Sequence, residues 1–407
     1  MLSNKSVSRP YKPNWLQNIV LIYLLSSSFT CVKSSNNAGS FELDKSWPDP
    51  SVVSLEYFGS GVALNSKNNV VLLHRSNKMV KIRQGMVNLT DEIIEDDVVL
   101  VLDAISGKIK ASWGRGKFVK PHGIEISEAG HLFVTDVSLH QVFKFRYDEK
   151  TELWEDTPTL TIGERFVPGN DHDHFCSPAD VAVMPITGEF FVADGYCNSR
   201  IVKFSKDGTY LTEFHSGSSS QPNLPSVAFN VTHAVAIAIP CEASAYDESL
   251  PPVIFVADRN NGRVQASTEN GTYLYEIPYK VFGHTKEMLL SFSFSKRGCS
   301  PQFYGTLFAI NGHLPLGQSK VFEILVSNVH YKLVSSFAVS NMNNGVTRIE
   351  TPHDIAVSAS GQVLYVVEAY DNLTIKRFQF HASNSGTYLE ISILRYYILA
   401  LTICLFI

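Results

Sequence analysis

Three histidines stand at the start of similar apolar segments. His122 lies in KPHGIEI, His233 in VTHAVAI and His353 in TPHDIAV. Three neutral imidazoles are a common ligand set of a catalytic zinc ion, because the fourth position stays open for water or substrate. The same side chains could instead be polar residues that bind water in a channel. The residue types therefore favour a zinc site, provided that the fold brings the three histidines together.

An acidic residue and a pair of cysteines lie close to these motifs. Asp354 directly follows His353, so its carboxylate could bind a hard cation or orient the imidazole. Cys176 and Cys197 stand near the two ends of the segment HFCSPADVAVMPITGEFFVADGYC. In a secreted protein this pair predicts a disulfide that stabilises the fold by about 3 kcal/mol and holds the neighbouring Tyr196 in place.

The remaining cysteines and histidines are less informative. Cys241 and Cys299 could pair with each other, which the sequence alone leaves open. The stretch DHDHFC suggests a rival metal site made of His172, His174 and Cys176, although closely spaced histidines in a polar loop are more often solvated.

The elements that must position these residues are short strands in a repeated unit. An apolar strand, a turn, a second strand ending in Asp or Glu, a polar turn and a third strand recur from residues 123, 180, 234 and 354. Steps of 57, 54 and 120 residues separate the unit starts at 122, 179, 233 and 353, which is typical of a β-propeller. With further units near residues 62 and 293, the sequence predicts an all-β, six-bladed propeller with NHL-like repeats over residues 45–380. The first strand of each blade lines the channel, so the three histidines should converge.

Composition and the two ends of the chain bear on where the protein works. A net charge of −5 over 407 residues gives no indication of a nucleic-acid partner. Residues 1–34 join basic residues to an apolar run, which predicts a signal peptide or signal anchor. Residues 381–407 form a hydrophobic tail, either a glycolipid-anchor signal or a single-pass segment. Together with sequons at Asn88, Asn230, Asn270 and Asn372, these features predict a glycoprotein of the secretory pathway, lumenal or extracellular, that is secreted or anchored to a membrane.

The motifs, taken together and in order, resemble one enzyme family. They are GVALNSKNNVVLLHR, KPHGIEI, VTDVSLHQVFKF, HFCSPADVAV, DGYCNSRIVKFS, VADRNNGRVQ and TPHDIAV. They are similar to peptidyl-alpha-hydroxyglycine alpha-amidating lyase, the lyase half of peptidylglycine alpha-amidating monooxygenase. The resemblance covers about Leu55 to Phe380. The combination of motifs, in this order, is far more specific than the pattern of a generic NHL-type propeller.

The resemblance implies two metal ions. The zinc ligands of the family match His122, His233 and His353. A calcium ion in the channel would be held by backbone oxygens at the positions of Val62 and Ile124 and by the carboxylate of Asp354.

The resemblance also implies three catalytic residues and a reaction. The catalytic Tyr of the family falls on Tyr196, its catalytic Arg on Arg75 and a further active-site Arg on Arg259. Cleaving the N–C bond of a peptidyl-alpha-hydroxyglycine gives a peptide amide and glyoxylate. A bound zinc ion would make the substrate hydroxyl more acidic. We expect Tyr196 to act as the base, Arg75 to stabilise charge and Arg259 to bind the substrate carboxylate. A structural ion pair is the alternative role for either arginine.

Three departures from the family pattern concern the surroundings of the site. Thr351 replaces the usual Met before Pro-His-Asp, and Thr232 replaces the usual Pro before the second histidine. Thr232 also completes the sequon of Asn230, where a glycan would crowd the channel. The second disulfide of the family is absent, since its positions hold Phe255 and Ala266.

The sequence thus predicts a zinc-dependent peptidylamidoglycolate lyase, with a separate copper monooxygenase supplying its substrate. The alternative is a non-catalytic extracellular NHL-type propeller that binds peptides or glycans. A calcium-dependent esterase on a six-bladed propeller would need several carboxylate and amide oxygens around the axis, where this sequence offers mainly histidines.

Overall fold

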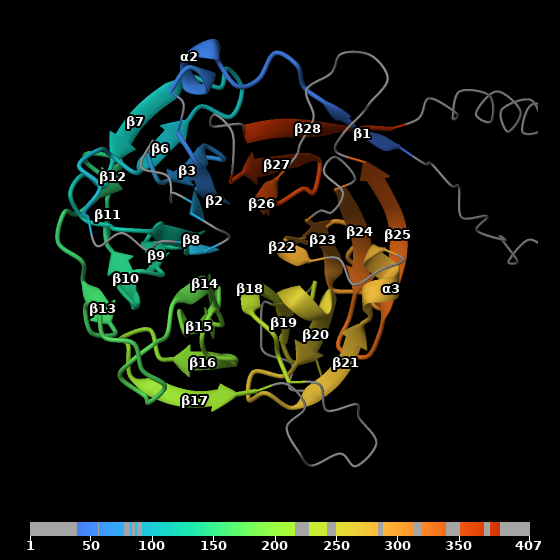
Figure 1. The fold of residues 1–407 in the computed structure, drawn as a ribbon. Helices are drawn as coiled ribbons and strands as arrows, with labels where there is room; N and C mark the ends of the chain where they lie inside the picture. The colour runs from blue at the N-terminus through green and yellow to red at the C-terminus, as the bar shows by residue number, and fades with distance from the viewer. Residues whose placement is uncertain are drawn as a thin grey trace, which may run out of the picture. The chain divides into compact units, whose positions relative to one another are not determined.

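The chain forms six four-stranded antiparallel sheets arranged around a central axis (Figure 1). This architecture confirms the all-β, six-bladed propeller expected from the repeat spacing. The computed structural model describes residues 39–55, 57–76, 82–83, 86–87, 92–215, 228–241, 250–283, 288–312, 319–338, 351–369 and 375–382. The expected signal segment, residues 1–34, and nearly all of the C-terminal tail lie outside the described residues, as do the sequons at Asn88 and Asn372.

Each sheet is one blade, and its strands follow one another from the axis outward. Blades 1 to 3 are β2 (Gly59–Leu64), β3 (Val70–His74), β6 (Val99–Leu102) and β7 (Ile109–Trp113); β8 (Pro121–Ile126), β9 (Leu132–Asp136), β10 (Gln141–Phe145) and β13 (Leu160–Ile162); β14 (Pro178–Val183), β15 (Phe190–Asp194), β16 (Arg200–Phe204) and β17 (Tyr210–Phe214). Blades 4 to 6 are β18 (Thr232–Ala238), β19 (Val253–Asp258), β20 (Arg263–Ser267) and β21 (Tyr273–Ile277); β22 (Leu289–Ser295), β23 (Gly305–Asn311), β24 (Lys320–Val326) and β25 (Tyr331–Ala338); β26 (Pro352–Val357), β27 (Val363–Glu368), β28 (Ile375–His381) and β1 (Ser40–Leu43).

Minor elements decorate the blades. They are the hairpins of β4 (Ile82–Arg83) with β5 (Met86–Val87) and of β11 (Tyr147–Asp148) with β12 (Leu153–Trp154), the helices α2 (Pro50–Val53) and α3 (Tyr279–Phe282), and the 3₁₀ turn η1 (Arg259–Asn261). No helix among the described residues is long and apolar enough to cross a membrane.

The second strand of each blade explains the apolar runs in the sequence. Every residue of β9, β15 and β19 is buried, because both faces of these strands are covered by neighbouring blades. The cores therefore lie between blades: Leu73 and Val99 of blade 1, for example, pack in one cluster with Val134 and Phe145 of blade 2. The outermost strands are partly exposed, as β7 and β17 show.

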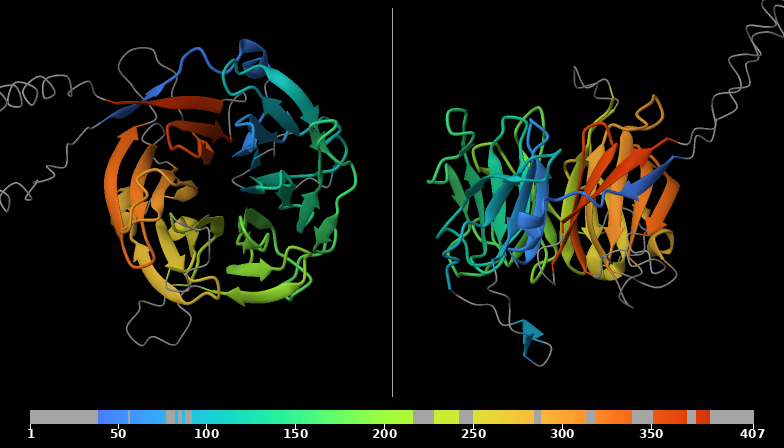
Figure 2. Two further views of the ribbon diagram at one scale, coloured as in Figure 1. Left: turned by 180° about the vertical axis from the view of Figure 1, so that it is seen from behind. Right: turned by 90° about the horizontal axis from the view of Figure 1, so that it is seen from above.

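The ring is closed by the two ends of the propeller. The N-terminal strand β1 pairs with β28 and completes blade 6, as the edge-on and rear views of Figure 2 show. The compact unit runs from Phe41 to Phe380, and its first strand precedes residue 45, where the sequence placed the start of the domain. This closure joins residues more than 300 positions apart, such as Asp44, whose N–H donates to the carbonyl of Arg377.

Candidate active site

Each inner strand has a β-bulge at one equivalent position. The pairing registers shift at the start of β2, β8, β14, β18, β22 and β26. The bulges contain, from blade 1 to blade 6, Ser60, His122, Ala179, His233, Leu290 and His353. A bulge bends its strand and re-aims a side chain, which is how these residues come to face the axis. Histidines and other residues alternate, so the imidazoles come from every second blade.

The three expected zinc-binding histidines do converge. One ring nitrogen from each of His122, His233 and His353 lies within 4.8 Å of the others. The Nδ1 atoms donate to backbone carbonyls of the bulge in the next blade: 2.8 Å to Ala179, 2.6 Å to Leu290 and 2.6 Å to Ser60, respectively. Because each Nδ1 carries the proton, each Nε2 of a neutral imidazole has a free lone pair.

Burial keeps these imidazoles neutral. It lowers the pKa of His122 and His233 well below 6.5, and it lowers the pKa of His353 to about 3, with the Arg75 charge as the next cause. The Tyr196 hydroxyl lies 2.8 Å from Nε2 of His122 and 3.0 Å from Nε2 of His233. One hydroxyl proton cannot satisfy both acceptors. The donor set therefore fits a cation held by imidazole nitrogens, as zinc is.

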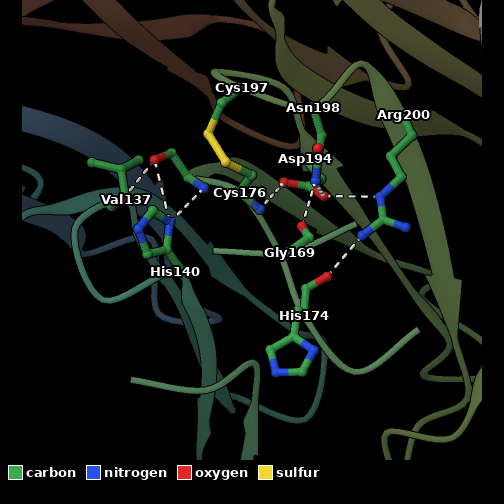
Figure 3. Close-up of a disulfide and its surroundings, with 10 residues drawn as sticks. Val137, His140, Gly169, His174, Cys176, Asp194, Cys197, Asn198 and Arg200 are labelled. Atoms are coloured by element: carbon green, nitrogen blue, oxygen red, sulfur yellow. Dashed lines mark hydrogen bonds and ion pairs between the residues drawn. A yellow bond between two sulfur atoms is a disulfide. The ribbon is translucent and has the colours of Figure 1, made fainter. Parts of the chain in front are cut away.

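Tyr196 reaches the histidines because the turn that carries it packs directly on blade 4. A side chain on Gly195 would lie 2.0 Å from the carbonyl oxygen of Thr232, so the backbone of this turn abuts the start of β18. The other side of the turn is held by the Cys176–Cys197 disulfide, which the structure confirms (Figure 3). Tyr196 itself is about one-third exposed, which leaves it open to a ligand.

A buried ion pair supports the same turn. Asp194, at the end of β15, accepts from the backbone N–H of Cys176 at 2.8 Å and from Asn198 at 2.7 Å (Figure 3). Arg200 donates to the same carboxylate at 2.9 Å, and its other nitrogens bind Glu213 and three backbone carbonyls, including that of His174. The disulfide and this cluster together fix the backbone on both sides of Tyr196.

The two expected arginines occupy equivalent positions in blades 1 and 4, directly after the second strand. The N–H of Arg75 donates to the carbonyl of Phe58, and that of Arg259 to the carbonyl of Val231. Arg259 contacts the tyrosine: its Nη1 lies 3.4 Å from the hydroxyl of Tyr196 and its guanidinium 5.7 Å from the ring centre. Arg75 leans toward blade 2, where its Nε donates to the Pro121 carbonyl at 2.9 Å, next to His122.

Below the histidines, the channel contains a cavity of about 390 Å³ lined by carboxylates. The residues expected to hold calcium, Val62, Ile124 and Asp354, all line it, and so do Glu125 and Asp180. Asp354 accepts from the N–H of Val62 at 2.8 Å and from the hydroxyl of Ser291 at 2.5 Å.

Burial raises the pKa of each of these carboxyls. The pKa is about 6 for Asp354 and about 8 for Glu125, and it lies well above 3.8 for Asp180, where the Asp354 charge is the second cause. Oxygen donors gathered in this way fit a hard cation such as calcium.

The rival metal site in DHDHFC does not form. Cys176 is bonded to Cys197, His172 stacks on Tyr210 with ring centres 3.8 Å apart, and His174 pairs with Asp171 at 2.8 Å. All three side chains therefore make local contacts instead of forming a shared metal site.

The structure shows the surroundings of Thr232, of its sequon at Asn230 and of the remaining cysteines. Thr232 is fully buried, and Asn230, which is exposed, accepts a hydrogen bond from Asn260 at 3.0 Å. Cys241 and Cys299 form a second disulfide, which resolves the pairing that the sequence left open and links blades 4 and 5.

Three charged residues near the site were not expected from the sequence. Glu125 and Asp180 face the axis in the inner strands and could have been found from their place after the repeat start. Lys120 lies two residues before His122, and burial together with the Arg75 charge lowers its pKa to about 8. Its signal was its position in KPHG, immediately before the histidine motif.

The chain is similar to several known proteins. A family model described as NHL repeat matches residues 175–204. The chain is 35% identical over 356 residues to peptidyl-glycine alpha-amidating monooxygenase of Mus musculus, which covers 83% of this chain and 32% of that protein. It is 31% identical to peptidyl-alpha-hydroxyglycine alpha-amidating lyase 1 of Drosophila melanogaster, over 76% of this chain and 54% of that protein. Lyase 2 of the same species is 30% identical, over 77% of this chain and 69% of that protein. The chain thus spans about a third of the length of the mouse relative.

Proposed function

Because the chain belongs to the family of peptidyl-alpha-hydroxyglycine alpha-amidating lyases, we propose that it cleaves peptides ending in alpha-hydroxyglycine to the peptide amide and glyoxylate. One observation carries the proposal. One ring nitrogen from each of three neutral histidines lies within 4.8 Å of the others, and the hydroxyl of Tyr196 contacts two of the three rings. A propeller that only bound peptides would have no need to gather four such groups there.

We infer that zinc occupies the histidine ring, with His122, His233 and His353 as its ligands. The support is the tautomer of the three imidazoles. Each Nδ1 donates its proton to a backbone carbonyl, so each Nε2 keeps a lone pair that can bind a metal ion. A zinc ion here would supply a Lewis acid that makes the substrate hydroxyl more acidic.

In this proposal the general base is the tyrosinate form of Tyr196, which has lost its hydroxyl proton before the reaction begins. Its oxygen takes the proton of the alpha-hydroxyl while the carbon–oxygen double bond of glyoxylate forms and the carbon–nitrogen bond breaks. The same proton then passes to the departing nitrogen, which leaves as a neutral amide. Arg259, 3.4 Å from the phenolic oxygen, stabilises the tyrosinate during the transfer.

Arg75 binds the carboxylate of the substrate in this arrangement. Its Nε is held by the Pro121 carbonyl on the side of the ring next to His122, and its charge acts on all three histidines. This proposal differs from the expectation from the sequence, in which Arg75 stabilises charge and Arg259 binds the carboxylate. The contact between Arg259 and Tyr196 favours it.

Calcium is the ion that we propose for the cavity below the ring. Asp354 would bind it with backbone oxygens of Val62 and Ile124, as the family resemblance implies. Asp180 and Glu125 line the same cavity, and a divalent cation there would favour the charged forms of their carboxyl groups. The ion would remove the repulsion among the buried carboxylates and so stabilise the inner strands.

The cysteines support a proposal about the compartment. Two disulfides, Cys176–Cys197 and Cys241–Cys299, form readily in the secretory pathway and outside the cell, so we place the protein in the lumen or the extracellular space. Its substrates would be hydroxylated peptides made there by a copper monooxygenase.

The test uses the purified full chain and a synthetic peptidyl-alpha-hydroxyglycine. Glyoxylate release is followed before and after chelation, after zinc is added back, and in His233→Ala. The matched control is His215→Ala, since His215 is exposed and outside the ring. The proposal expects metal-restored release in the wild type and in the control, and loss in His233→Ala. Glyoxylate at only the spontaneous rate from folded, metal-loaded protein would refute the lyase activity.

A further inference from the structure

One layer above the histidine ring lies a second ring of equivalent residues. They stand two positions before the bulge residues and are Phe58, Lys120, Ser177, Val231, Met288 and Thr351. In blades 1, 2, 4, 5 and 6 the carbonyl of this residue accepts a hydrogen bond from the residue that follows the second strand, as Val137 donates to Lys120 at 3.1 Å. The backbone position is therefore the same around the ring, and Lys120 is its charged member.

The backbone of Lys120 is held on both sides. Its N–H donates to Asp136 at 2.9 Å and its carbonyl accepts from Val137, immediately before Pro121 and His122. The side chain is half-buried and near enough to Arg75 and His353 for its charge to act on both. The ammonium charge thus acts at the histidine ring, next to Arg75, which binds the Pro121 carbonyl immediately before His122.

The ammonium group has no hydrogen-bonded acceptor among the described residues, although a buried carboxylate lies nearby. In blade 3, Asp194 pairs with Arg200 across the strands, and in blade 4, Asp258 pairs with Arg263. In blade 2 the residue opposite Asp136 is Gln141, whose amide donates to the Gly163 carbonyl instead.

Asp136 therefore lacks an arginine, but it does not lack donors. Its two oxygens accept four backbone N–H groups, from Val119, Lys120, Ser138 and Leu139, at 2.8 to 2.9 Å. The lysine ammonium lies near enough to the Arg75 guanidinium for the two positive charges to interact, and an anion that joins the site would relieve this repulsion.

We propose that Lys120 and Arg75 together bind the carboxylate of the terminal hydroxyglycine, so that Lys120 is a substrate-binding residue. This inference rests on the proposed function. The carboxylate is one bond from the reacting carbon, so it must lie within the layer next to the histidines, where Lys120 is. An acidic side chain of the preceding residue would lie several bonds farther out. Two cations on neighbouring blades match the two oxygens of one carboxylate.

Binding of unreactive ligands tests the assignment without turnover. The metal-loaded full chain is titrated calorimetrically with a short peptide ending in glycine and with the same peptide ending in glycinamide. We expect Lys120→Met to weaken binding of the carboxylate by roughly ten- to a hundredfold and binding of the amide by less than about twofold. Lys120→Arg should retain most of the difference. Equal losses on both ligands, or none, would overturn the assignment.

The matched control is Lys117→Met. Lys117 lies three residues earlier in the same loop, where its ammonium binds the Asp156 carbonyl at 2.9 Å, away from the channel. It should discriminate between the two ligands as the wild type does. A loss of discrimination in this control as large as that in Lys120→Met would attribute the effect to loop structure and sink the proposal.

Turnover separates this inference from the proposed function. With the hydroxyglycine peptide, Lys120→Met should raise KM for glyoxylate release more than it lowers kcat, because the base and the histidines stay in place. If the wild type releases no glyoxylate but still prefers the carboxylate ligand through Lys120, the lyase activity fails and the anion subsite stands. If the wild type releases glyoxylate rapidly and Lys120→Met binds both ligands as the wild type does, the lyase activity stands and the assignment of Lys120 fails.

Discussion

Replacing Arg200 by methionine should be one of the most destabilising single changes near the site. The Arg200 side chain is 2% exposed and the carboxylate of Asp194 is fully buried. Arg200 donates to Asp194, to Glu213 and to three backbone carbonyls of residues 170–174. Methionine fills much of the volume but leaves Asp194 with only its neutral donors, Cys176 N–H and Asn198.

The magnitude follows from the uncompensated charge. Breaking a buried pair by removing one partner costs about 3–5 kcal/mol, because the remaining carboxylate stays desolvated. For a propeller of Phe41–Phe380 the unfolding entropy is roughly 0.7 kcal/mol/K, at about 2.1 cal/mol/K per residue. The midpoint of thermal unfolding should therefore fall by about 4–7 °C. The turn bearing Tyr196 should also loosen, so glyoxylate release should fall by more than the unfolded fraction explains.

Thermal and urea unfolding of the full chain measure the effect. Arg146→Met is the control, since Arg146 pairs with Glu155 on the surface and is 62% exposed, so it should cost less than about 1 kcal/mol. The double variant Asp194→Asn with Arg200→Met removes both charges and should be more stable than Arg200→Met alone. A loss below about 1 kcal/mol for Arg200→Met, or a double variant that is less stable still, would refute the reasoning.

Three further changes probe the surroundings of the site. Replacing Cys176 and Cys197 together by serine should lower stability by about 3 kcal/mol and reduce glyoxylate release more than peptide binding, as unfolding and kinetic assays would show; unchanged release would separate the disulfide from catalysis. The Asp171 carboxylate raises the pKa of His174, so this contact stabilises the fold below pH 6.5 and is lost as the pH rises through the higher folded-state pKa. His174→Gln should accordingly destabilise the protein more at pH 5.5 than at pH 8.5 in thermal melts, and a pH-independent effect would contradict this. Asp354→Asn should abolish thermal stabilisation by added calcium while wild-type protein gains several degrees, and equal gains would exclude that carboxylate as a ligand.

Repeat spacing was sufficient to predict the ring of blades. The interval between His122 and His233, with a unit at Ala179 between them, is the length of two blades, and this equivalence requires the histidines to meet at the axis. The blade around Leu290, whose repeat start is not recognisable in the sequence, was predicted only from the gap in the spacing. The closing strand β1 was not predicted, because its pairing with β28 is a contact between distant parts of the chain and leaves no local pattern.

Contacts between blades determine how the side chains of the site lie relative to one another. These contacts could not be predicted from the sequence. Tyr196 and Arg259 belong to different repeats, and their 3.4 Å contact depends on how the turn at Gly195 packs on Thr232. The sequence motifs named both residues through resemblance, and they left this contact open. Lys120 was not predicted for a similar reason. Its interaction is with the charge of Arg75 in the preceding blade, more than forty residues away in the sequence.

The alternation of histidines has a physical basis in the blade-to-blade hydrogen bonds. Each imidazole needs an acceptor for its Nδ1 proton, and the carbonyl in the bulge of the next blade provides it, as Ala179 does for His122. The three acceptor carbonyls belong to Ser60, Ala179 and Leu290, and these residues bring no imidazole of their own to the axis. A six-fold fold can therefore present a three-fold set of nitrogens. Half of the blades supply the imidazoles, and the other half supply the carbonyls that fix the tautomer in which each Nε2 could bind the proposed metal ion.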